Sequence, residues 1–368
     1  AVRQFKWEEG NNNAIVIHLT LVPFLAAAGE LKTKPTQHSV KALLEYGIQP
    51  DILVCRTEHH ISQDIKRKIA LFCNVNINAV VESMDASTIY DVPLLMYKEQ
   101  LDKTVLSKLK LPTKAEPDME SWKDFLGRLK NPTSDVRIGL VGKYVELPDA
   151  YKSITEAFIH AGAKNECKVR VEYIPSESIY AENVKEKLGH LDGVLVAPGF
   201  GSRGIEGKIE AIKYVRENNV PFFGICLGMQ CCVIEFGRNV LGLANANTTE
   251  IDENAPHPVI NMMEEQKSIT TKGGTMRLGA YPCDVKKGTK AFAAYGKQHI
   301  SERHRHRYEF NNKYLEQYEA AGMIASGINP ESNLVEIVEL KNHPFFVGGQ
   351  FHPELKSTVA NPHPLFIK

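Results

Sequence analysis

The chain has 368 residues, and its 44 Lys plus Arg balance its 44 Asp plus Glu, so the formal net charge is zero. This length allows two domains with separate cores, and the neutral balance argues against general nucleic-acid binding through charge. No apolar run approaches the ~20 residues that a membrane helix needs, and no signal-peptide pattern opens the chain. Seven scattered cysteines without paired metal-ligand spacing favour a reduced compartment, and we expect a cytoplasmic protein.

The first hundred residues alternate between strand and helix patterns. Ala14–Leu21 is apolar and β-branched and predicts a buried strand, and Asp51–Cys55 and Ala79–Val81 predict two more. Helical patterns at Val40–Tyr46 and Gln63–Cys73 separate these strands. The alternation predicts an α/β layer with a parallel sheet.

A basic segment, Lys32–Gln37, follows the first strand. It gathers two ammonium groups, two hydroxyls and an amide within six residues, and such a cluster can bind phosphates. A solvated loop is the alternative. The basic run Lys66–Lys68 lies on a predicted helix, where such runs usually form a solvated face.

The composition changes at Leu109–Thr133, where prolines, acids and lysines indicate an interdomain linker with one short helix at Trp122–Leu129. A new strand, Val136–Gly142, then opens a second α/β region. Its two glycines do not form a P-loop, because the pattern GxxxxGK[ST] is absent. Strands at Lys168–Ile174 and Gly193–Ala197 continue this region and again alternate with helices.

A sharp turn is predicted around Cys226. The apolar run Pro221–Phe223 ends at Gly224, and Cys226 and Gly228 follow before an apolar helix, which is the pattern of a nucleophile elbow. Glycines without a Cβ leave room for the turn and for the close approach of helix and strand. The positive end of a helix dipole favours a thiolate. The alternative is that Cys226 is a small buried hydrophobe, as cysteines usually are.

Two further motifs are predicted at the carboxyl edge of the same sheet, where open α/β proteins bind ligands. The glycine-rich loop Pro198–Gly204 follows a strand and can direct backbone N–H groups at an oxyanion. The strand Phe345–Gln350 leads into His352-Pro353-Glu354. A strand that continues through this tripeptide places His352 and Glu354 on one face, where the carboxylate can orient an imidazole base. A capped turn is the alternative for the tripeptide alone, but all three motifs together favour Cys–His–Glu catalysis.

These residues resemble a class I glutamine amidotransferase, and a wider set of motifs is similar to the CTP synthase family. The similar stretches span nearly the whole chain: Lys32–His38, Ile69–Val75, Val141–Ser153, Gly224–Gln230, Gly273–Gly279, Glu302–Glu309 and Phe351–Glu354. KTKPTQHS together with ERHRHRYE is specific to this family, whereas GICLGMQ and HPE occur in many amidotransferases. The resemblance implies the C-terminal part of a P-loop-like (Rossmann-type) synthetase domain at 1–110, a linker at 111–134 and a doubly wound amidotransferase domain at 135–368.

The resemblance also implies a glutaminase site. Cys226 would attack the side-chain amide of glutamine, His352 would transfer the proton to the leaving ammonia, and Glu354 would orient His352. Backbone groups of Gly199 and Leu227 would form the oxyanion hole. The implied glutamine-binding residues are Gly199, Leu227, Gly228, Met229, Gln230, Glu250 and Arg307. Glu250 would bind the ammonium and Arg307 the carboxylate, although the arginines of Arg303–Arg307 could equally contact phosphate or solvent. No metal ligands are expected.

For the first domain, the resemblance implies a site for UTP, or for CTP as feedback inhibitor. Its residues would be Lys32, Thr33, Lys34, Pro35, Thr36, Gln37 and Lys68, the last often from a neighbouring subunit. Met84, Asp85 and Ala86 would contact the adenine of ATP, and Gly273–Gly279 resembles a lid linked to activation by GTP. A homotetramer that stacks into filaments is also implied.

One departure from the family limits these expectations. The family's P-loop and Mg²⁺-binding acids precede everything in this sequence, whose two ends also look cut. We therefore expect a truncated sequence that can at most hydrolyse glutamine, while ATP and Mg²⁺ would be bound mainly by the missing part. Two alternatives remain open: a non-catalytic regulatory or filament-forming subunit, and the amidotransferase of another synthetase, such as one that makes GMP.

Overall fold

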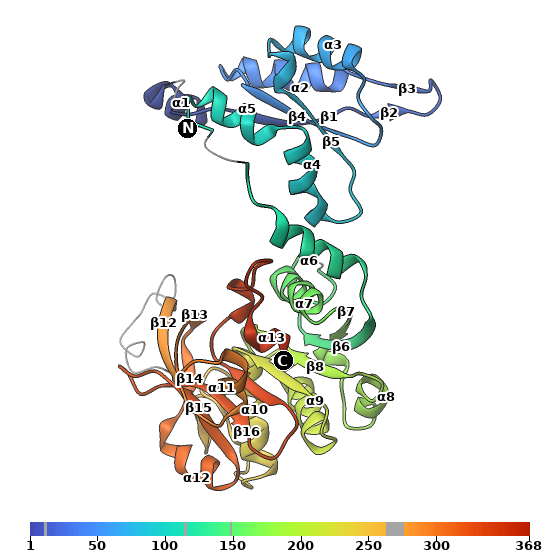
Figure 1. The fold of residues 1–368 in the computed structure, drawn as a ribbon. Coiled ribbons are helices and arrows are strands. Elements are labelled where there is room, and N and C mark those ends of the chain that lie inside the picture. The colour runs from blue at the N-terminus through green and yellow to red at the C-terminus, as the bar shows by residue number, and fades with distance from the viewer. Residues whose placement is uncertain (11–12, 114–115, 148, 263–275) are drawn as a thin grey trace. The chain divides into compact units, whose positions relative to one another are not determined.

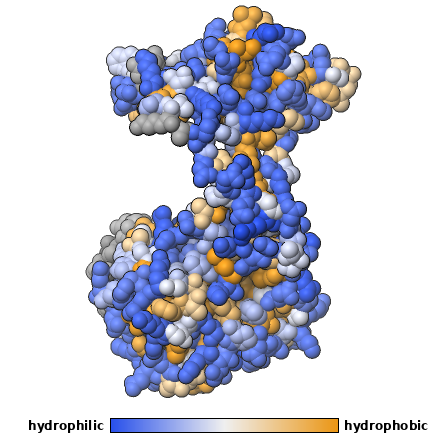
Figure 2. All heavy atoms as spheres, viewed as in Figure 1, coloured by the Kyte–Doolittle hydropathy of each residue, from blue (hydrophilic) through white to orange (hydrophobic). Residues whose placement is uncertain are grey.

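The computed structural model describes residues 1–10, 13–113, 116–147, 149–262 and 276–368 (Figure 1). The chain divides into two compact units, Ala1–Met119 and Glu120–Lys368, which are described separately below. No helix among the described residues is both long and apolar enough to cross a membrane. On the face that Figure 2 shows, the surface of each unit is mainly hydrophilic, with smaller apolar patches.

The first unit is built on a parallel sheet with the strand order β1–β4–β5, where β1 is Ile17–Leu21, β4 is Ile52–Thr57 and β5 is Val80–Met84. The other elements are α1 (Val2–Glu9), β2 (Phe24–Leu25), β3 (Glu30–Leu31), α2 (Lys34–Glu45), α3 (Gln63–Cys73), α4 (Val92–Lys98) and α5 (Leu101–Lys108). Alternate residues of β4 enter two separate apolar clusters. Side chains of a strand point alternately to the two faces of a sheet, so both faces of β4 are covered.

The prediction of a buried strand at Ala14–Leu21 is wrong in its burial. The strand forms as β1, but it lies at the edge of the sheet, and of its five residues only Thr20 is buried. Ile17, Leu19 and Leu21 are 45%, 67% and 52% exposed. A run of apolar residues reports strand propensity but does not tell an edge strand from a central one.

The second unit contains a nine-stranded sheet in the order β13–β12–β15–β16–β17–β9–β8–β6–β7. Its strands are β6 (Ser134–Gly142), β7 (Cys167–Pro175), β8 (Gly193–Val196), β9 (Phe222–Ile225), β12 (Arg277–Val285), β13 (His299–His306), β15 (Met323–Ile328), β16 (Val335–Leu340) and β17 (Phe346–Gly349). The five strands from β17 to β7 pair in parallel, and the other four extend the sheet with antiparallel pairs. A small separate sheet joins β10 (Asn247–Thr248), β11 (Pro258–Met262) and β14 (Tyr308–Phe310).

Helices cover both faces of the parallel part, as a doubly wound fold requires. The helices of this unit are α6 (Glu120–Lys130), α7 (Lys152–Lys164), α8 (Val184–Leu188), α9 (Ile205–Glu217), α10 (Leu227–Asn239), α11 (Lys290–Tyr295), α12 (Leu315–Ala320) and α13 (Pro364–Ile367). In β8, Val194 and Val196 pack with α9 and α10, whereas Leu195 packs with α7 and α13 on the other face. The helix that the sequence placed inside a linker forms as α6 and contacts α7.

Two glycines bring α10 against the sheet. A Cβ on Gly228 would lie 2.1 Å from the carbonyl oxygen of Val196 in β8, and a Cβ on Gly224 would lie 2.8 Å from the backbone of Gly228. Real Cβ atoms do not approach backbone this closely, so only glycine permits this packing. The elbow prediction assigned this role to both glycines, and their surroundings confirm it.

Gly228→Ala should destabilise the protein by at least about 2 kcal/mol, because the added methyl group must displace a helix or a strand. Gly127→Ala is the matched control, since Gly127 lies in α6 with no heavy atom within 4 Å of its Cβ position. In a helix that replacement is neutral or stabilises by up to about 1 kcal/mol. Urea unfolding of both variants measures the difference, and equal effects would contradict the packing account.

Candidate active site

The candidate site lies where three neighbouring parallel strands end. Strands β17 and β8 flank β9, and the paired residues are Gly349 with Ile225 and Val196 with Gly224. Cys226 follows β9, the loop Pro198–Gly204 follows β8, and His352 follows β17. The sequence predicted these three motifs at one sheet edge, and the topology brings them together there.

Cys226 has the strained backbone of a nucleophile elbow. Its φ of 51° and ψ of −103° lie outside the regions that L residues favour, and such a conformation costs about 1–3 kcal/mol. Its N–H donates to the carbonyl of Gly349 at 2.8 Å, and it caps α10, whose first turn begins at Leu227. The side chain is 3% exposed. Its sulfur therefore lies at the N-terminus of a helix, in a largely buried position.

His352 and Glu354 form a buried hydrogen-bonded pair. The Nδ1 of His352 lies 2.8 Å from Oε1 of Glu354, and both residues are less than 10% exposed. The strand continuation expected from the sequence is wrong, because β17 ends at Gly349 and Pro353–Leu355 form a 3-10 turn. The proline cannot donate to a strand ladder, and the turn, not strand alternation, brings the two side chains together.

The surroundings of His352 favour its protonated form. Burial acts to lower its pKa, but the nearby sulfur of Cys226 and the hydrogen-bonded, charged Glu354 outweigh burial and raise the pKa to about 10. The Nε2 atom makes no hydrogen bond of good geometry to any described residue, although Cys226 is near enough to act on it. With Nδ1 held by Glu354, Nε2 is the nitrogen free to exchange a proton with a group at the sulfur.

A small cavity opens beside the sulfur. It has a volume of about 40 Å³, and its lining includes the predicted nucleophile Cys226 and four of the residues expected to bind glutamine: Gly199, Gln230, Glu250 and Arg307. Glu250 also accepts a hydrogen bond from the N–H of Gly201 at 2.8 Å, which ties it to the loop after β8. An acid and an arginine in one cavity match the two opposite charges of a free amino acid.

Backbone N–H groups are available near the sulfur for an oxyanion. Leu227 is the first residue of α10, and the first N–H groups of a helix have no partner within it. Gly199 lies beside Leu227, since a Cβ on Gly199 would be 3.5 Å from Cδ2 of that residue. Gly228, Met229 and Gln230 continue the first turn and are buried.

Two buried lysines support the loop after β8, and the sequence analysis missed both. Lys143 donates to the carbonyl of Phe200 at 2.7 Å, and the fully buried Lys208 donates to the carbonyl of Ala197 at 2.6 Å. Burial lowers the pKa of Lys208 to about 8. A lysine in the sequence usually indicates surface, so only the fold could identify these two.

A buried polar cluster behind the cavity was also missed. His304, His306 and Glu336 place potential ligand atoms within 4.8 Å of one another. Burial lowers the pKa of His304 to about 2 and of His306 to about 3, and it raises the pKa of Glu336 to about 7. The guanidinium of Arg277 lies 2.8 Å from Glu336 and is itself the cation of this cluster. A metal ion there would be repelled by that charge.

In the first unit, two of the three expected nucleotide-binding lysines, Lys32 and Lys68, lie on different elements but act on one carboxylate. Lys32 pairs with Glu30, and this hydrogen bond and charge, with a smaller effect of Lys68, lower the pKa of Glu30. Thr33 caps α2, and Lys34, Pro35, Thr36 and Gln37 form its first turn. The hydroxyl of Thr36 is buried and donates to the carbonyl of Leu21 at 2.9 Å, so it is already used within the fold.

The segments expected at ATP and at the lid are only partly described. Met84 ends β5, the carboxylate of Asp85 accepts from Arg56 at 2.9 Å, and Ala86 is exposed. Residues 273–275 of the lid stretch lie outside the described residues. Of the rest of that stretch, Met276 precedes β12 and Arg277–Gly279 form its first three residues.

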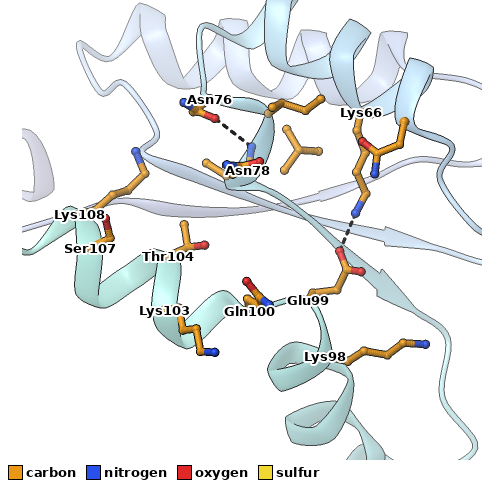
Figure 3. Close-up of a pocket in the computed structure, with 14 residues that line it drawn as sticks. Lys66, Asn76, Asn78, Lys98, Glu99, Gln100, Lys103, Thr104, Ser107 and Lys108 are labelled. Atoms are coloured by element: carbon orange, nitrogen blue, oxygen red, sulfur yellow. Dashed lines mark hydrogen bonds and ion pairs between the residues drawn. The ribbon is translucent and has the colours of Figure 1, made fainter. Parts of the chain in front are cut away.

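A cavity of about 580 Å³ in the first unit is lined by none of the expected nucleotide-binding residues (Figure 3). Lysines 66, 98, 103 and 108 surround it, and Figure 3 shows Lys66 reaching Glu99, at 2.6 Å. Lys103 pairs with Glu116 at 2.7 Å. At least two of its four cations are thus neutralised locally, and the cavity adds no support for a phosphate site.

Comparison with known proteins agrees with this geometry. Residues 146–368 match the family described as glutamine amidotransferase class-I. The second unit also resembles a solved structure described as the Trypanosoma brucei CTPS glutaminase domain with bound acivicin, with 36% identity and a TM-score of 0.60. That match covers 63% of this chain and 91% of the other. The fold and the site therefore define a class I glutamine amidotransferase.

The matches of the first unit and of the whole chain identify the family within this class. Residues 1–111 match the family described as CTP synthase N-terminus. The chain is 71% identical to a CTP synthase of Cytophaga hutchinsonii and 69% identical to one of Flavobacterium johnsoniae, and it covers 68% of each. This chain belongs to the CTP synthase family, whose members are glutamine-dependent ligases. The predicted family and α/β fold class are thereby confirmed.

Glu354→Gln should reduce stability in a pH-dependent way. Because the pKa of His352 is raised to about 10 in the fold, the imidazolium stabilises the fold fully below about pH 6.5 and loses this effect as the pH rises through 10. The variant keeps an acceptor for Nδ1 but loses the charge. It should be about 1–2 kcal/mol less stable at pH 6, and the deficit should shrink towards pH 10.

Denaturant unfolding between pH 6 and pH 10 measures this deficit. Glu331→Gln is the matched control, since Glu331 is exposed and its replacement should have a small effect at every pH. A Glu354→Gln deficit that stays constant across this range would contradict the raised pKa of His352.

Proposed function

We propose that the second unit hydrolyses glutamine with Cys226, His352 and Glu354 as its catalytic residues. The observation that carries this proposal is the strained cysteine at the N-terminus of α10 beside an imidazole whose other nitrogen is held by a carboxylate. That arrangement matches the roles of nucleophile, base and orienting acid in covalent catalysis.

In this mechanism the sulfur of Cys226 attacks the side-chain amide carbon of glutamine. The oxyanion that forms accepts hydrogen bonds from the N–H groups of Gly199 and Leu227. His352 gives its Nε2 proton to the leaving ammonia, and the carbon stays bound to sulfur as a thioester. Water then attacks that carbon while His352 takes up a water proton, and glutamate and the free thiolate are released.

Glutamine recognition rests on the two charged residues of the small cavity. Glu250 is proposed to bind the α-ammonium and Arg307 the α-carboxylate, while Gln230 lines the cavity beside Cys226. Gly228 and Met229 are proposed to act only through the buried first turn of α10. Arg307 lies between β13 and β14, and Glu250 follows β10, which belongs to the same small sheet as β14, so this sheet brings both charges to one cavity. A site with one partner of each charge sign favours a free amino acid over a simple amide.

Incubating the purified chain with glutamine and assaying glutamate tests this proposal. Wild-type protein should release glutamate, and Cys226→Ala should reduce the rate to background, because the nucleophile is lost. Cys167→Ala is the matched control, since Cys167 starts β7 far along the sheet order from β9. Glutamate release that survives in Cys226→Ala would refute the mechanism, and none in the wild type would favour a non-catalytic role.

For the whole reaction we propose ATP-dependent amination of UTP to CTP with the ammonia released from glutamine. The first unit would bind the triphosphate of UTP, or of the inhibitor CTP, at Lys32–Gln37 and Lys68. Met84–Ala86 would contact ATP, and the stretch 273–279 would respond to GTP in a homotetramer. The sequence contains no GxxxxGK[ST] motif, so we assign phosphoryl transfer and Mg²⁺ binding to none of the described residues.

Lys32→Ala should weaken UTP binding by about tenfold or more, because a lysine that contacts phosphate supplies a charge-assisted hydrogen bond. Lys41→Ala is the control: Lys41 lies in α2, the helix that begins just after Lys32, is exposed and falls outside the proposed site. Isothermal titration with UTP measures both affinities. Equal affinity in the two variants would remove Lys32 from the site and would reopen the alternative of another synthetase.

A further inference from the structure

Gln350 is a buried residue close in the chain to the proposed catalytic His352. It follows β17 directly and precedes His352 by two residues. Its side chain has no exposed surface, and its backbone N–H donates to the carbonyl of Glu336 at 2.9 Å. In the sequence, Gln350 is only the last residue of a predicted strand.

The hydrogen bonds around Gln350 fix which end of its amide faces the sulfur. The Nε2 of Gln230 lies 2.9 Å from the carbonyl oxygen of Tyr308, and a carbonyl can only accept, so this atom is the NH₂ of Gln230. The same NH₂ lies 3.2 Å from Oε1 of Gln350 and donates its second proton there. The NH₂ of Gln350 must then point the other way, towards the sulfur of Cys226 at 3.6 Å.

Among the hydrogen bonds of good geometry that the described residues make with the sulfur, the one from Gln350 supplies a donor. The sulfur's other hydrogen-bond partner is the carbonyl oxygen of Arg305 at 3.9 Å, which can accept a hydrogen bond from the thiol but cannot donate one. The Nε2 of His352 makes no hydrogen bond of good geometry in the described structure. The charge of the His352 imidazolium acts on the sulfur, and a direct N–H donor adds to that effect in a site that is only 3% exposed.

We propose that Gln350 is a further catalytic residue, which donates a hydrogen bond to the sulfur of Cys226 and favours its thiolate form. This inference rests on the proposed glutaminase function and adds a residue to it. The same donor acts in both half-reactions. It stabilises the thiolate before attack, and it stabilises the electron pair that returns to sulfur when water breaks the C–S bond of the thioester.

Gln230 acts as a positioning residue in this scheme. Its amide is held by the backbone of Tyr308 and in turn orients the amide of Gln350. His306 donates through Nδ1 to the same carbonyl at 3.0 Å, so that oxygen is fixed from two sides. The chain of contacts therefore runs from β14 through two glutamines to the nucleophile.

The test measures the alkylation rate of Cys226 by iodoacetamide between pH 6 and pH 10 in the full chain, read by mass spectrometry of the peptide that contains it. Gln350→Met removes the donor without adding a charge and is the decisive variant. Gln350→Glu keeps the size and the acceptor for Gln230, but its carboxylate also disfavours the thiolate through charge. Each variant should react about tenfold more slowly than wild type at pH 7, and this difference should shrink towards pH 10. Gln317→Glu makes the same change at an exposed position of α12 and should match wild type.

Rates in folded Gln350→Glu and Gln350→Met that match wild type at every pH would overturn the proposal. If neither variant folds, Gln230→Leu provides the test, since it leaves Gln350 in place without its orienting bond. It should slow alkylation at pH 7 and less so towards pH 10, and an unchanged profile would overturn the proposal. Alkylation does not need turnover, so this result stands apart from the glutamate assay. Wild-type protein that alkylates as expected but releases no glutamate would refute the proposed function and leave the donor role intact.

Discussion

The close contact between α10 and β8 is the constraint on which the site depends. Because Gly228 has no Cβ, the first turn of α10 packs against the carbonyl of Val196, where any other residue would place an atom 2.1 Å away. This packing holds Cys226 at a positive φ, and its N–H bonds to Gly349 of β17. The strain of one residue is thus balanced by the packing of a helix and two strands, and it positions the sulfur next to the residues that follow β17.

Much of this arrangement could be predicted from the sequence. Strict glycine spacing around Cys226 indicates the elbow, because backbone strain and close packing leave few residue choices at those positions. The alternation of strands and helices indicates a parallel sheet, and parallel strands end at the same edge. The helix α3 forms at the predicted residues Gln63–Cys73, where an N-cap serine precedes an amphipathic pattern.

The rest could not be predicted, because it depends on which side chains meet across the fold. Lys208 reads as a surface residue, yet it is fully buried with its ammonium on a backbone carbonyl. Gln350 reads as a strand residue, and its role follows only from its distance to a sulfur 124 positions away. The prediction that β1 is buried failed for the same reason, because apolar composition favours a strand but does not determine its neighbours.

Trapping the reaction intermediate tests the central claim most directly. The protein is mixed with excess glutamine and quenched in acid during turnover, and its intact mass and peptide masses are then measured. The account predicts one γ-glutamyl group, attached to the peptide that contains Cys226 and absent from Cys226→Ala. A γ-glutamyl group on another residue would contradict the account.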